Sequence, residues 1–127
     1  MGAHVVSIVG VWHIDSMQLW DRDYLDLEGP AHFTFGRDRL GSFQFGAVAG
    51  YIDYRVTSTE GHARVEFSWE GFNDSDASSG RGFATLTDGR LEGRLFFHNG
   101  DDSGFVATRL PARAGESKTK RAPPKRS

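Results

Sequence analysis

Cysteine is missing from this sequence of 127 residues, and its absence excludes several kinds of chemistry. Without cysteine there is no disulfide bond, no thiolate nucleophile and no zinc site with sulfur ligands. A chain without cysteine is more natural in a reducing compartment than among secreted scaffolds, so we expect a cytoplasmic protein. Residues 1–10 lack the basic segment of a signal peptide and the length of a membrane span, so we expect neither.

Lysine is absent from residues 1–108, where sixteen Asp and Glu residues outnumber eight Arg residues. Residues 109–127 reverse this balance, with seven Lys and Arg residues against Glu116 alone. An acidic body repels phosphates, so any nucleic-acid role would have to rest on the basic tail. We expect residues 111–127 to be a disordered tail, because they hold three prolines and their apolar residues do not recur at the spacing of a helix or a strand. Such a tail is a solubilising extension or docks on an acidic surface.

Motifs that identify a reaction are also missing. No segment has the recognised spacing of a nucleophile and its base, of a set of metal ligands or of a phosphate-binding loop. Asp74-Ser75-Asp76 resembles the start of a calcium loop. However, its glycine comes one position late, at Gly80, and Thr85 stands where a glutamate ligand is needed. We therefore expect no metal site and no cofactor.

Aromatic residues are abundant, and they fall in alternating runs between glycine-centred turns from Gly10 to Leu110. Eight such runs in succession predict eight antiparallel strands. Because an open meander would leave two long edges, we predict an all-β fold, a single antiparallel up-and-down β-barrel over residues 1–110. An open curved sheet and a two-sheet sandwich are the alternatives.

Turn residues predict the register of the last strands. Asp88-Gly89 is the sequence typical of a two-residue type I′ hairpin, and it pairs Gly82 with Leu95. A tight turn over 99–102 would then pair Leu95 with Val106.

Two further turns, which come earlier in the chain, would pair Tyr54 with Val65 and Phe33 with Phe45. Between the first two strands, Asp21–Asp26 is expected to form a helical turn or an irregular loop.

In this register three phenylalanines, Phe83, Phe96 and Phe105, point outward on adjacent strands. Neighbouring exposed phenylalanines are unusual on a monomer, so we expect them to form a homodimer interface. The alternative is that Val5–Val9 or the tail covers them.

The longer loops gather at one end of the predicted barrel, and binding sites usually lie on loops held by a rigid scaffold. This rim is rich in carboxylates and aromatic rings, which suit a hard cation or a cationic ligand. An eight-stranded barrel filled with phenylalanine has little room inside, so we expect a small ligand near the mouth. The candidate ligand-binding residues are Trp20, Asp21, Asp23, Tyr24, Trp69, Glu70, Arg81, His98, Asp101 and Asp102.

The favoured function is a non-enzymatic barrel that binds a small ligand or acts as a regulator, as a homodimer. An enzyme with cyclase-like or isomerase-like chemistry is one alternative, in which Glu70 with Asp74, or His98 with Asp101, would act as an acid–base pair. A protein-interaction module without a ligand is the other.

A short motif adds a resemblance. Gly10-Val11-Trp12 resembles the G-x-W that opens barrels of the lipocalin and avidin superfamily, whose tryptophan plugs the closed end of the barrel. The wider pattern resembles a group of small bacterial proteins with no known activity. The shared segments are Trp20–Asp26, Phe43–Gly46, Trp69–Gly71, Gly80–Gly82 and Phe96–Ser103. The resemblance implies a barrel and no particular ligand, because the biotin-binding and lipid-binding residues of better-known barrels have no counterpart in this sequence.

Overall fold

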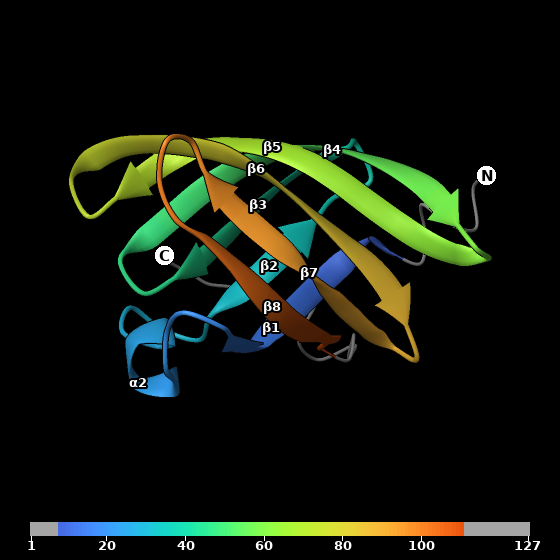
Figure 1. Cartoon of the computed structure of the whole chain (residues 1–127), viewed down its shortest axis with the longest axis horizontal. Helices are drawn as coiled ribbons and strands as arrows, with labels where there is room; N and C mark the ends of the chain where they lie inside the picture. The colour runs from blue at the N-terminus through green and yellow to red at the C-terminus, as the bar shows by residue number, and fades with distance from the viewer. Residues whose placement is uncertain (1–7, 111–127) are drawn as a thin grey trace.

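Eight antiparallel strands run around a closed barrel in the order in which they occur in the chain (Figure 1). The barrel is seen in a computed structural model that describes residues 8–110. β1 pairs with both β2 and β8, and this second pairing closes the sheet. The prediction of an all-β up-and-down barrel is confirmed, and the open sheet and the sandwich are excluded.

The elements differ in length. The strands are β1 (Gly10–Met17), β2 (His32–Phe35), β3 (Leu40–Phe45), β4 (Val48–Thr59), β5 (His62–Asn73), β6 (Asp76–Thr87), β7 (Arg90–Phe97) and β8 (Asp102–Arg109). A short helix, α2 (Arg22–Leu25), lies between β1 and β2, where a helical turn or irregular loop was expected. The expectations for residues 1–7 and 111–127, which include the basic tail and the N-terminal cover, lie outside the described residues.

The hairpin between β6 and β7 forms as its turn sequence dictates. Asp88 and Gly89 both have positive φ, as a two-residue I′ turn requires, and Thr87 pairs with Arg90. The predicted pairing of Gly82 with Leu95 follows and is confirmed.

The next hairpin differs from the prediction by three residues. Leu95 pairs with Ser103 rather than with Val106, because the turn is a three-residue loop with Asn99 at positive φ. A shift by an odd number of residues turns every side chain of β8 to the other face of the sheet. The prediction that Phe105 points outward is therefore wrong. Phe105 lies in the core, with its ring centroid 4.8 Å from that of Phe33.

The two upstream registers differ by two residues, which leaves the faces unchanged. Tyr54 pairs with Phe67 rather than Val65, and Phe33 pairs with Phe43 rather than Phe45. In the first case the turn residues are Glu60 and Gly61, one position later than expected.

Aromatic rings occupy the inside of the barrel. Phe33 lies at the centre, with neighbouring ring centroids between 4.8 and 6.0 Å away. An eight-stranded barrel is only wide enough for side chains to fill it, and here most of the filling is aromatic. The large, fully buried side chains include Trp12, Ile14, Phe33, Phe43, Phe45, Tyr54, Leu91 and Leu95.

Trp12 closes the barrel end where the described part of the chain begins. Its ring is fully buried, its Nε1 donates a hydrogen bond to the carbonyl oxygen of Ile8 at 2.9 Å, and the Arg109 guanidinium lies 4.3 Å from the ring. Nearby, the buried Tyr54 hydroxyl donates to the carbonyl oxygen of Gly36, and burial raises the pKa of this phenol. The Trp12 and Tyr54 donors are thus both satisfied by backbone carbonyl groups of the barrel wall.

Replacing Phe105 tests the observed register of β8. Because its ring is buried against Phe33, Phe105→Ala should lower the free energy of unfolding by about 3–5 kcal/mol. Urea denaturation measures this loss, and Val106→Ala, on the outward face of the same strand, is the matched control and should cost far less. A larger loss for Val106→Ala than for Phe105→Ala would contradict the register.

Candidate functional site

The barrel end at the close of β1 is plugged by Trp20. Its ring lies 5.2 Å from that of Phe45 and 6.2 Å from that of Phe97, and it stacks on Tyr24 of α2 at 6.0 Å. Trp69, behind Phe97 at 5.3 Å, is almost fully buried and donates from its Nε1 to the carbonyl oxygen of Phe96. The structure therefore brings both Trp20 and Trp69 against Phe97, in a packed arrangement of rings.

Helix α2 is held over this end by contacts with the turn between β3 and β4. The Tyr24 hydroxyl accepts a hydrogen bond from the Ala47 amide at 3.2 Å, and the Gly46 amide donates to the carbonyl oxygen of Leu25 at 2.9 Å. Gly46 has a φ of 55°, and a Cβ there would lie 2.0 Å from the Tyr24 ring. Only glycine allows the ring to lie this close to the turn.

Carboxylates fix the ends of this helix. Asp21 caps it by accepting a hydrogen bond from the Tyr24 amide. Asp26 accepts from the Ala31 amide at 3.1 Å and pairs with Arg22 at 3.0 Å. The Ala31 hydrogen bond, helped by Arg22, lowers the pKa of the Asp26 carboxyl. Asp23 is exposed on the same helix.

The other predicted rim carboxylates are spread over the outer wall. Residues 71–79 form the tip of the β5–β6 hairpin, in which Asn73 pairs with Asp76. Glu70 is exposed on β5 opposite Tyr51, and Asp102 pairs with Arg94 at 2.8 Å.

The two acid–base pairs suggested by the sequence are not formed. Within residues 8–110 no hydrogen bond or ion pair joins Glu70 to Asp74 or His98 to Asp101. No group of three or more His, Asp or Glu side chains in this part of the chain is arranged to hold a metal ion.

Arg81 differs from the other strand arginines of the outer wall. Arg55, Arg64, Arg90 and Arg94 each form an ion pair with a nearby carboxylate. Arg81 is exposed on β6 and has no hydrogen-bonding or ionic partner among the described residues. An unpaired guanidinium keeps all five donors available to a ligand.

Three depressions meet at Arg81, and one of them, shared with Asp53, Arg55 and Glu66, lies towards β4. Of the other two, the first, of about 280 Å³, lies where β6 passes the end of β7. It is lined by Ser79, Gly80, Arg81, Phe96, Phe97, His98 and Asn99. The His98 amide donates to the carbonyl oxygen of Ser79 at 2.8 Å, which keeps the end of β7 beside β6.

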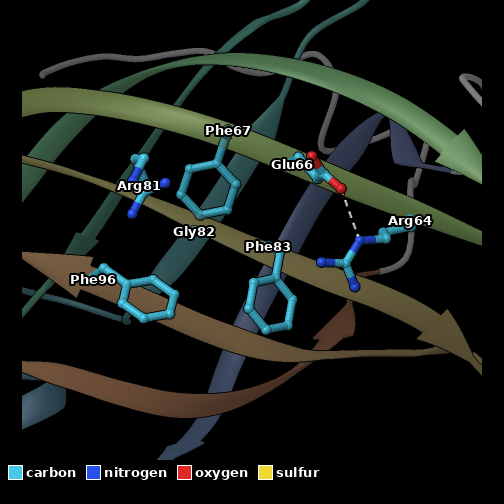
Figure 2. Close-up of a pocket in the computed structure, with 7 residues that line it drawn as sticks. All are labelled: Arg64, Glu66, Phe67, Arg81, Gly82, Phe83 and Phe96. Atoms are coloured by element: carbon cyan, nitrogen blue, oxygen red, sulfur yellow. Dashed lines mark hydrogen bonds and ion pairs between the residues drawn. The ribbon is translucent and has the colours of Figure 1, made fainter.

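The second depression, of about 330 Å³, lies further along the same wall (Figure 2). Figure 2 shows Phe83 and Phe96 side by side, with Arg81 near Phe96 and Arg64 on the other side of Phe83. The two phenyl centroids are 6.2 Å apart, and the Arg64 guanidinium lies 4.4 Å from the Phe83 ring. Both phenylalanines point outward, as predicted.

Ser79, Phe96 and Asn99 line the site around Arg81, and the sequence did not identify them as ligand-binding residues. Period-two alternation places Ser79 beside Arg81 on the outer face of β6, so this neighbour could have been found. Asn99 could not, because its position depends on the three-residue loop between β7 and β8.

Comparison of the chain with family models, with curated proteins and with solved structures gives no significant match. The resemblance to other barrels is thus shown at the level of architecture, an eight-stranded antiparallel up-and-down barrel. Within residues 8–110, no helix has the length and apolar character needed to span a membrane.

Acid should selectively remove the contribution of Asp26. Because its pKa is lowered in the folded state, its ionised form stabilises the fold above the usual value of 3.8, and this stabilisation is lost as the pH falls below it. Asp26→Ala should therefore lower the melting temperature at pH 7 and have a shrinking effect towards pH 2. Thermal unfolding followed by circular dichroism measures this.

The matched control is Asp23→Ala, on the exposed side of α2. Its effect on the melting temperature at pH 7 should be small. A decrease for Asp26→Ala that stays constant from pH 7 to pH 2 would show that the carboxylate charge is irrelevant.

Proposed function

We propose that the protein is a non-enzymatic binding barrel that takes up a small anionic ligand, a carboxylate or a phosphate, beside Arg81. The observation that carries this proposal is the Arg81 guanidinium, which has no ionic or hydrogen-bonding partner in the described part of the chain and lines a depression of about 280 Å³. Arginine matches carboxylates and phosphates with two parallel hydrogen bonds, and such charge-assisted bonds are among the strong ones in proteins.

The neighbouring side chains suit an anion. The Ser79 hydroxyl, the Asn99 amide and a ring nitrogen of His98 are all potential donors on the walls of the same depression. Phe96 and Phe97 add apolar surface for the body of the ligand. A few polar groups within an apolar lining are the usual composition of a small-molecule site.

Nearby carboxylates do not neutralise Arg81. Glu70 lies opposite Ser79 in the β5–β6 ladder but forms no ion pair with Arg81. Glu66, which lines two depressions together with Arg81, pairs with Arg64 at 3.0 Å. The Asp102 carboxylate is held by Arg94 at 2.8 Å. The unpaired positive charge therefore favours an anion here, whereas the acidic rim by itself had suggested a cation.

The proposed site lies on the outer wall of the barrel, whereas the sequence had predicted a site at the barrel mouth. Of the residues named from sequence, Arg81 and His98 keep the role of ligand-binding residues. Trp20, Tyr24 and Trp69 serve to close the barrel end behind them, and Asp21 caps α2.

We also propose that the chain is related to the lipocalin and avidin barrels. Support comes from Gly10-Val11-Trp12, because Trp12 is fully buried where the first strand begins and its ring closes that end. This is the place of the tryptophan in the G-x-W that the motif resembles.

Titration with inorganic phosphate, followed by amide chemical shifts, tests the anion site. The amides of Ser79, Arg81, His98 and Asn99 should shift and saturate together. Arg81→Gln should weaken binding about 10- to 100-fold, because it removes charge-assisted hydrogen bonds. A parallel titration with acetate distinguishes a preference for carboxylates from one for phosphates.

Two further variants sharpen this test. His98→Ala should weaken phosphate binding by a smaller factor than Arg81→Gln does. Arg90→Gln, at the far end of β7 and already paired with Glu92, should leave phosphate binding unchanged. Absence of saturable shifts, or equal affinities for Arg81→Gln and the unchanged chain, would overturn the proposal.

A further inference from the structure

Two arginines and two phenylalanines alternate on the outer wall at the middle of β6 and β7. Arg81 lies directly opposite Phe96 in the ladder, and Phe83 lies directly opposite Arg94. All four point outward, because Gly82 and Leu95 between them face the core. We call these four side chains the Arg–Phe square, in which each arginine borders a phenylalanine both along its strand and across to the next.

Half of the Arg–Phe square is already engaged within the chain. The Arg64 guanidinium lies 4.4 Å from the Phe83 ring, and Arg94 is held in the plane of its guanidinium by Asp102 and Gln18, both at about 3 Å. Phe96 is half-buried and contacts the ring of Phe83, and Arg81 has no ionic or hydrogen-bonding partner among residues 8–110. The two side chains left open, Arg81 and Phe96, are therefore direct neighbours.

We infer that a second copy of this chain docks on this face about a two-fold axis that runs between β6 and β7, parallel to both strands. This rotation exchanges the two strands, and so it lays Arg81 of each copy on Phe96 of the other. The same rotation brings each Phe83 to the face of Arg94 in the other copy, and leaves the in-plane bonds of Arg94 intact. One self-complementary square thus supplies four arginine–aromatic contacts at once.

Symmetry is what favours a second copy over an unrelated partner. In an isologous interface residue i contacts residue j and j contacts i, so the face must carry both members of each complementary pair. The Arg–Phe square has this property for Arg81 with Phe96 and for Phe83 with Arg94. A guanidinium stacks through its face and binds anions through its edge, so this inference does not rest on the anion site.

Exchanging the two open side chains tests the inference. Sedimentation velocity over a concentration series, in a buffer free of phosphate and carboxylates, should show the unchanged protein as a dimer that dissociates on dilution. Phe96→Arg places arginine against arginine at two symmetric contacts and should raise the dimer dissociation constant at least about tenfold. Adding Arg81→Phe to Phe96→Arg restores an arginine over each ring, and should bring the constant back to within about threefold of the original.

Phe72→Ser is the matched control, because this phenylalanine is 54% exposed on the same sheet but lines a different depression. It should leave the dissociation constant unchanged, and near-ultraviolet circular dichroism should show that each variant keeps the packed core. An unchanged protein that is monomeric at every concentration would overturn the inference. So would a folded double variant that dissociates as readily as Phe96→Arg alone.

Discussion

Aromatic packing inside a closed ring of eight strands is the constraint on which the rest of this molecule depends. Phe33 is surrounded by Phe35, Phe43, Phe67 and Phe105, with ring centroids within about 6 Å. Burying such rings supplies much of the favourable free energy of a small domain. Because the strands must close around these rings, the diameter of the barrel and the volume available inside it are set together.

A filled interior leaves little room for a ligand inside the barrel, and the proposed binding site therefore lies on the outside. One end is closed by Trp12 and the other by Trp20, which packs on Phe45 and Phe97. What the barrel offers instead is a rigid wall, on which outward side chains are placed by the sheet register. Arg81 and Phe96 owe their positions to this wall, and the proposed anion site and dimer contact both use it.

Local signals in the sequence were sufficient for the architecture and for part of the register. Asp88-Gly89 accepts positive φ at both turn positions, and so the pairing of β6 with β7 was correctly predicted. The next turn could not be predicted from residue types, because Asn99 in a left-handed conformation lengthens the loop between β7 and β8. That single difference reversed the face of β8 and moved Phe105 from the expected surface into the core.

The candidate site was less accessible to sequence reasoning, because it depends on which charged groups pair. Glu66 pairs with Arg64, two residues away on its own strand, although the ladder places Arg55 directly opposite it. Among residues 8–110, Arg81 is left without a carboxylate partner as a result of such choices, and neither composition nor spacing reveals them.

Diffraction from a crystal pressurised with xenon tests the central claim most directly, since xenon enters apolar cavities large enough to hold it. If the barrel is filled by its own rings and closed at both ends, no xenon density should be found inside it. Density among Phe33, Phe43 and Phe67 would reveal an interior cavity, and would contradict the proposal that binding takes place on the outer wall.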